Sequence, residues 1–90
     1  MPIISQFYGI IISMHYREND KHKLPHLHAE YADFDASFDF NSNLIAGKMP
    51  NKQQKMIQAW ILIHQEELYA LWKLIETQRG EGWFKIEPLK

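Results

Sequence analysis

The chain contains no cysteine among its 90 residues. Disulfides, thiolate metal sites, iron–sulfur clusters and cysteine nucleophiles are therefore all excluded. The longest apolar stretches, residues 10–12 and 60–63, fall far short of the roughly 20 residues that are needed to cross a bilayer. The first residues also lack the basic stretch and the long apolar core of a secretory signal. These absences lead us to expect a cytoplasmic protein with no membrane-spanning segment.

The chain also has little net charge, because ten lysines and arginines oppose eleven aspartates and glutamates. Charge therefore does not support nucleic-acid binding, although it leaves local contacts open. Hydrophobic residues make up 46% of the chain, as in folded globular proteins. Ninety residues suffice for one core and are too few for two, so we expect a single domain over residues 1–90.

Alternation of apolar and polar side chains predicts a sheet in the first half of the chain. Residues 7–16 alternate and predict one half-buried strand, and a charged loop follows over residues 17–24. Residues 26–31 and 34–40 alternate again, and residues 44–48 can form a further short strand after a turn. We therefore expect a small antiparallel sheet of three to five strands.

A two-residue turn at Ala32-Asp33 would determine the register of one hairpin in this sheet. The facing pairs would then be Tyr31 with Phe34, Glu30 with Asp35, His28 with Ser37 and His26 with Asp39. Like charges that face each other are destabilising, so the pairing of Glu30 with Asp35 suggests a cation, a proton, a bulge or a slightly different turn.

Beyond Pro50 the period of the apolar residues changes from two to 3.6. This spacing predicts a long amphipathic helix over residues 51–78. Residues 79–82 end the helix, and residues 83–87 can form an additional edge strand before Pro88. At about 1.5 Å per residue the helix would be roughly 40 Å long, which exceeds the length of so small a sheet. It must therefore kink near His64-Gln65 or project at one end. The predicted fold is α+β, with the sheet packed against this one C-terminal helix.

In the predicted strands, the side chains that alternate outward are polar and share one face of the sheet. They are Ser13, His15, His26, His28, Glu30, Asp35, Ser37 and Asp39. His26 and His28 stand at positions i and i+2 of one strand and so project to the same side. The simplest interpretation is a solvated polar face, as an antiparallel sheet with one open side requires.

Two chemical interpretations of the same residues stay open. Without a cofactor, His26 or His28 acts as an acid–base catalyst, with Glu30 or Asp39 orienting the imidazole. Alternatively, His26, His28 and Glu30 hold a divalent transition metal such as zinc, with His15 or Asp39 as other candidates for the third ligand.

Two tryptophans of the predicted helix, Trp60 and Trp72, have two interpretations. Tryptophans on the apolar stripe of a helix usually anchor that helix to its sheet. An exposed tryptophan would instead indicate a protein interface, so Trp60 and Trp72 are also the candidate partner-binding residues. His64 lies on the same stripe and is expected to be a core or rim residue rather than a functional one.

Three ordered motifs resemble a known bacterial family. They read Ile4-Ser5-x-Phe7-Tyr8-Gly9-Ile10, then His22-x-x-Pro25-His26-x-His28-x-Glu30-Tyr31, and later Ala59-Trp60-x-x-x-His64-x-Glu66-Glu67-Leu68-x-x-x-Trp72. Together they resemble the family called domain of unknown function 4160, over nearly the whole chain. The resemblance implies that His26, His28 and Glu30 form the functional patch.

The same resemblance implies a partner protein. Members of the family are similar to short stand-alone proteins encoded beside a second small protein of the domain of unknown function 2442 family. That layout resembles a toxin–antitoxin pair. We therefore expect an interaction component of a two-protein module, and in the more specific version of this hypothesis the protein cleaves RNA with its histidines. The alternative is a metal-binding domain or a metal-dependent hydrolase. The sequence also leaves open whether the protein forms a homo-oligomer.

Overall fold

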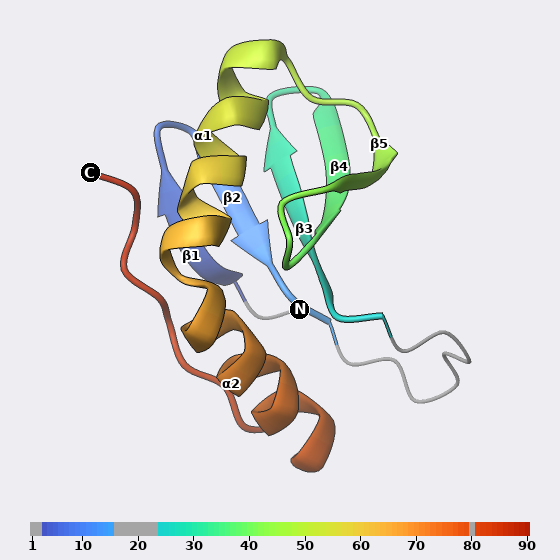
Figure 1. Cartoon of the computed structure of the whole chain (residues 1–90), viewed down its shortest axis with the longest axis vertical. Helices are drawn as coiled ribbons and strands as arrows, with labels where there is room; N and C mark the ends of the chain where they lie inside the picture. Colours follow the sequence, from blue (N-terminus) through green and yellow to red (C-terminus); the bar gives the residue numbers. More distant parts are fainter. Residues whose placement is uncertain (1–2, 16–23, 80) are drawn as a thin grey trace.

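Five antiparallel strands form a single sheet in chain order (Figure 1). They are β1 (Ile3–Phe7), β2 (Ile10–Ser13), β3 (His26–Tyr31), β4 (Phe34–Asp39) and β5 (Leu44–Gly47). The computed structural model describes residues 3–15, 24–79 and 81–90, so most of the predicted charged loop, with His22, lies outside the described residues. The five strands and two helices confirm the α+β class.

The first two strands correct one prediction, because the chain reverses within the alternating run of residues 7–16. Tyr8 and Gly9 form a tight turn with φ values of 49° and 78°, and Phe7 pairs with Ile10 on either side of it. Two-residue hairpin loops require positive φ at one or both central residues. Glycine adopts that conformation at little cost, so Gly9 allows the turn. The prediction of a single strand over residues 7–16 is therefore wrong.

The hairpin of β3 and β4 has the predicted register. His26 faces Asp39, His28 faces Ser37 and Glu30 faces Asp35. No bulge interrupts this pairing and the turn is the predicted one, so two of the four alternatives for the facing carboxylates, the bulge and the different turn, are wrong. Glu30 and Asp35 are both exposed, and water screens their mutual repulsion.

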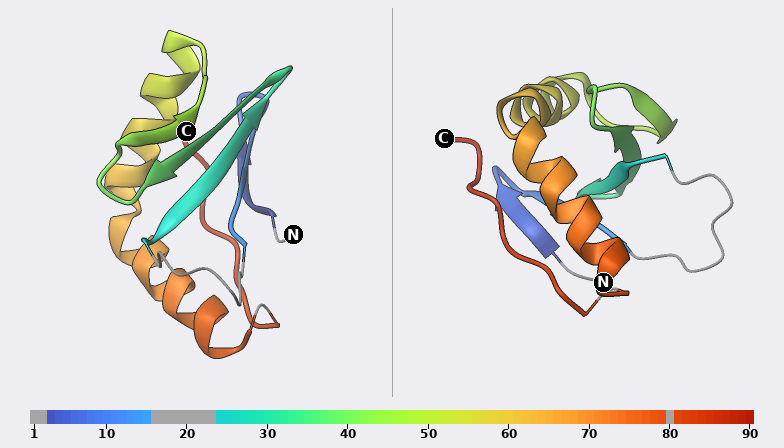
Figure 2. Two further views of the ribbon diagram at one scale, coloured as in Figure 1. Left: turned by 90° about the vertical axis from the view of Figure 1, so that its right-hand side faces the viewer. Right: turned by 60° about the horizontal axis from the view of Figure 1, so that its bottom comes forward.

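Two helices, α1 (Asn51–Ile63) and α2 (Gln65–Thr77), replace the predicted single helix. The break is at His64, whose φ of −109° and ψ of 25° depart from helical geometry, and it falls where the length argument placed a kink. Both helices lie on the same face of the sheet (Figure 2). Among the described residues, no helix is long and apolar enough to cross a membrane.

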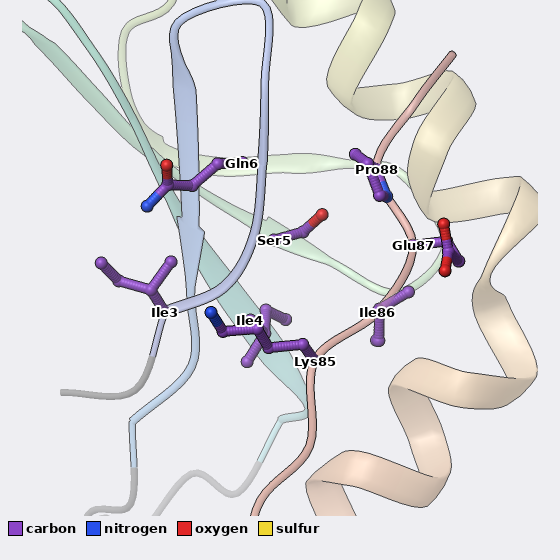
Figure 3. A pocket seen from close by; sticks show the side chains of 8 residues that line it. All are labelled: Ile3, Ile4, Ser5, Gln6, Lys85, Ile86, Glu87 and Pro88. Atoms are coloured by element: carbon purple, nitrogen blue, oxygen red, sulfur yellow. The ribbon is translucent and has the colours of Figure 1, made fainter.

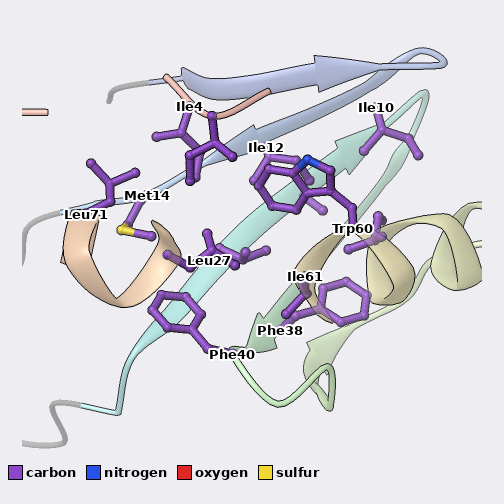
Figure 4. Close-up of a cluster of buried hydrophobic side chains, with 14 of the residues drawn as sticks. Ile4, Ile10, Ile12, Met14, Leu27, Phe38, Phe40, Trp60, Ile61 and Leu71 are labelled. Atoms are coloured by element: carbon purple, nitrogen blue, oxygen red, sulfur yellow. The ribbon is translucent and has the colours of Figure 1, made fainter. Parts of the chain in front are cut away.

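The core lies between the helices and that face of the sheet (Figure 4). Trp60 is completely buried at its centre and packs against Phe7, with ring centroids 5.5 Å apart. Other fully buried side chains come from both layers, namely Ile4, Ile10, Ile12, Leu27, Phe38, Ile57, Ile61, Leu68 and Leu71. Each such side chain contributes about 1.5–3 kcal/mol of burial free energy, which makes this contact the main source of stability.

The C-terminal segment, residues 81–90, runs beside β1 without becoming a strand. Ile86 N donates to Ile4 O at 2.8 Å, and the indole Nε1 of Trp60 donates to Glu87 O at 2.8 Å. Ile86 is itself buried. The predicted edge strand at residues 83–87 is therefore wrong, and the segment is tied to the core by single contacts.

Replacing Gly47 by alanine is expected to lower the free energy of unfolding by about 2–3 kcal/mol. Gly47 ends β5 with a φ of 83°, and an added Cβ would lie 2.8 Å from Ala36 Cα and also strike the backbone oxygen of Asp35. Backbone atoms of β4 cannot move aside without breaking the pairing of β4 with β5. Urea denaturation measures the loss.

Gly9→Ala provides the matched control for this prediction. Gly9 also has a positive φ, 78°, but its added Cβ would meet only the movable ring of Tyr31, at 3.3 Å. We expect a smaller loss of about 1 kcal/mol, from the left-handed conformation alone. Equal losses at both glycines would show that contact with β4 is not the cause.

Candidate functional site

Three histidine rings lie in a row at the open face of the sheet. The rings of His15 and His28 are 4.5 Å apart between centroids and nearly perpendicular, at 82°. The rings of His28 and His26 follow at 5.3 Å and 70°. We call His15, His28 and His26 the histidine row. Its members were all placed on this face by the alternation of the sequence.

The strand pairing explains why the row forms. His26 and His28 project from the same face of β3, because they are two residues apart, and Leu27 between them points into the core. Ser13 at the end of β2 faces His28, so the chain leaving β2 carries His15 to the same place. The β2–β3 register therefore adds the third imidazole to the pair on β3.

The hydrogen bonds of the row determine one tautomer. His26 Nδ1 lies 2.7 Å from Leu24 O. A carbonyl oxygen can only accept, so Nδ1 must carry the proton, and in the neutral ring the lone pair is on Nε2. His28 Nδ1 lies 3.2 Å from Ser37 Oγ, a hydroxyl that can donate or accept. His26 is thus oriented as a proton acceptor at Nε2.

A shallow depression of about 480 Å³ lies beside the row. His15 and His28 line one part of it, and Glu30, Asp33 and Asp35 supply carboxylates to the rest. Glu30 is exposed there. The predicted residues His28 and Glu30 therefore share one surface hollow that is open to solvent.

Asp39 faces His26 in the register, but its carboxylate is engaged elsewhere. Oδ1 accepts from the backbone N–H groups of Asn41 and Asn43, both at 2.9 Å, and Oδ2 accepts from Asn43 Nδ2 at 3.0 Å. These bonds stabilise the turn between β4 and β5. The group that orients His26 is consequently the Leu24 carbonyl rather than the predicted Asp39.

The same turn changes the pKa of Asp39. Partial burial raises this pKa, but the hydrogen bonds from Asn43 N, Asn43 Nδ2 and Asn41 N outweigh burial and hold the pKa below its ordinary value. Because the folded pKa is depressed, the stabilisation is present above the unfolded pKa of about 3.9 and is lost as the pH falls through the folded pKa.

Asp39→Asn is therefore expected to flatten the acid limb of the stability curve. The wild type should lose stability on acidification below about pH 4, and the variant should lose less over the same range. Urea midpoints at successive pH values measure both slopes. Parallel curves for the two proteins would show that the Asp39 turn contributes no pH dependence.

Metal ligation needs several ligands around one point. Among residues 3–15, 24–79 and 81–90, no group of three or more histidine or carboxylate side chains is placed to hold a metal ion. The zinc alternative, with His26, His28 and Glu30 as ligands, has no preformed ligand set in this part of the chain and stays a prediction.

The two tryptophans occupy different positions. Trp60 is wholly buried, so it is an anchor and has no surface to offer a partner. Trp72 on α2 is half-buried, with its ring 5.5 Å from that of His26 and 6.1 Å from that of Phe40. Trp72 therefore lies beside His26, at one end of the histidine row. No sequence signal could place it there, because the docking of α2 on the sheet decides this contact.

A family model described as Domain of unknown function (DUF4160) matches residues 9–73. The chain belongs to this family. The matched part of the DUF4160 chain includes the histidine row, Glu30 and both helical tryptophans. The predicted family is thereby confirmed. No curated protein and no solved structure matches the chain.

Proposed function

We propose that this DUF4160 protein is the toxin-like member of a bacterial two-protein module and cleaves RNA with its histidine row. The observation that carries the proposal is the contact of three imidazole rings beside an open depression. Imidazole is the side chain that gains and loses a proton near neutral pH, as general acid–base catalysis requires.

The two histidines of β3 have separate roles in the proposed reaction. His26 Nε2 removes the proton from a ribose 2′-hydroxyl, whose oxygen attacks the adjacent phosphorus. The bond from phosphorus to the 5′-oxygen breaks, and protonated His28 donates a proton to that leaving oxygen. The products are a 2′,3′-cyclic phosphate and a 5′-hydroxyl. DNA lacks the 2′-hydroxyl and is not a substrate.

Two features of the structure support this assignment. The bond from His26 Nδ1 to Leu24 O leaves Nε2 as the acceptor, which is the form that a base requires. The half-buried indole of Trp72 beside His26 provides an aromatic surface on which an unpaired base can stack. Single-stranded RNA, whose bases are available for stacking, is therefore the proposed substrate.

Incubation of the purified protein with single-stranded RNA tests the proposal. We expect fragments that end in 2′,3′-cyclic phosphate, with equal yield when a chelator is present. The matching DNA oligonucleotide should stay intact. Absence of cleavage would overturn the proposal, and cleavage that the chelator abolishes would favour the zinc alternative with His26, His28 and Glu30.

The partner in this module is proposed to be a small protein of the domain of unknown function 2442 type. This part of the proposal rests on the family resemblance. Trp72 is the helical tryptophan with surface available for an interface. Size-exclusion chromatography of the two proteins, alone and mixed, tests the complex and also reveals any homo-oligomer. A Trp72→Ala variant that binds as tightly as the wild type would remove Trp72 from the interface.

A further inference from the structure

A second cleft lies away from the histidine row, between the edge strand β1 and the C-terminal segment (Figure 3). Its volume of about 330 Å³ is near the lower end of small-ligand pockets. The walls are residues 3–6 on one side and residues 85–88 on the other. The cleft therefore separates two stretches of chain that run side by side.

The backbone explains why these two stretches do not close. They run in the same direction, and Ile86 N donates to Ile4 O at 2.8 Å. In a parallel ladder Gln6 N would next donate to Ile86 O, and the segment's own next donor would be residue 88, where proline has no N–H. Among the described residues no further backbone hydrogen bond joins the segment to β1. The ladder therefore ends after one bond.

The edge of β1 beyond that bond stays available. Phe7 pairs with Ile10 across the two-residue turn, so Gln6 and Ile11 form the next, non-hydrogen-bonded pair, and the N–H and C=O of Gln6 face the free edge of β1. The segment does not cover them, because residue 88 has no N–H to donate to Gln6 O, and Glu87 O accepts instead from Trp60 Nε1 at 2.8 Å. Gln6 thus presents one donor and one acceptor to the cleft.

Ser5 supplies an independent indication of a ligand. Its side chain points toward the cleft in Figure 3, and the residue is only 5% exposed. Its Oγ makes no hydrogen bond to any residue that the structure describes. A buried hydroxyl without a partner is costly, so a ligand that reaches Ser5 gains a hydrogen bond that the folded chain does not supply.

We propose that this cleft binds the extended backbone of a short peptide segment. A peptide carries donors and acceptors in alternation, which matches the edge at Gln6, and one of its amides bonds Ser5 Oγ. Small apolar side chains fit against Ile3, Ile86 and Pro88, which line the walls. Lys85 and Glu87 at the cleft balance each other in charge, so an uncharged backbone is favoured over an anion.

An NMR titration of the isotope-labelled protein with the uncharged peptide N-acetyl-trialanine amide tests this site. We expect saturable shifts of the amides of Ser5, Gln6 and Ile86. Ser5→Ala should weaken binding up to about tenfold, the effect of one neutral hydrogen bond. Ser13→Ala, which removes a buried serine hydroxyl outside the cleft, should leave binding unchanged.

Pro88→Ala is a second test variant, which adds a backbone donor where Ser5→Ala removes a side-chain hydroxyl. It returns an N–H to the segment, which can then bond Gln6 O and close the cleft, so peptide binding should weaken. The proposal is overturned if the wild type shows no saturable shift at millimolar peptide, or if Ser5→Ala or Pro88→Ala binds as well as the wild type. None of these outcomes bears on the histidine row.

Discussion

Replacing Trp60 by alanine is expected to lower the free energy of unfolding by about 3–5 kcal/mol, the range for truncating a buried aromatic side chain. Trp60 is fully buried, contacts Phe7 and donates its indole N–H to Glu87 O. The substitution therefore removes core volume and the tie to the C-terminal segment together. Urea or thermal denaturation measures the loss, and a cost below about 1 kcal/mol would contradict a central role for Trp60.

Trp60→Phe separates the two contributions. Phenylalanine keeps most of the apolar ring but cannot donate to Glu87 O, so we expect a smaller loss of about 1–2 kcal/mol. Hydrogen exchange of the Ile86 amide should accelerate in this variant, because the segment loses its hydrogen bond at Glu87 O and keeps the one from Ile86 N to Ile4 O. Unchanged exchange at Ile86 would show that the indole bond does not hold the segment.

Replacing His28 by alanine is expected to reduce RNA cleavage by about 10²–10⁴-fold, the usual contribution of a general acid or base. His28 is the middle member of the histidine row, so its loss removes the proposed acid and separates His15 from His26. Cleavage rates under single-turnover conditions measure the effect. A variant that retains most of the activity would exclude His28 from the reaction.

Two further variants make this result specific. His28→Gln can keep a hydrogen bond to Ser37 but cannot transfer a proton as imidazole does, so its activity should fall as far as that of His28→Ala. His64→Ala removes a histidine outside the row, one that is paired with Glu67 at 2.7 Å, and should cleave at the wild-type rate. Equal losses at His28 and His64 would indicate general destabilisation.

Local periodicity predicted the hairpin of β3 and β4 in detail. A two-residue turn and an alternation of period two leave one register, and His26, His28 and Glu30 face Asp39, Ser37 and Asp35 in the structure. The first hairpin was missed for a related reason. Alternation runs on through residues 7–16, and only the positive φ at Tyr8 and Gly9 reverses the chain.

The helical half was predicted less completely. The period of 3.6 located the apolar stripe, whose residues Ile57, Trp60, Leu68 and Leu71 are buried as expected. The break at His64 depends on how much of a helix so small a sheet can cover, which periodicity does not contain. The stripe is nearly continuous across the break, so the pattern alone describes one helix where the fold has two.

By itself, the sequence determined which side chains share a face, because backbone geometry alternates them along each strand. That parity placed His15, His26 and His28 together before any contact was known. The tertiary structure alone decided what surrounds them. The docking of α2 brought Trp72 beside His26, and the turn after β4 drew the Asp39 carboxylate away. Such contacts join residues far apart or bend the chain locally, so no repeating pattern records them.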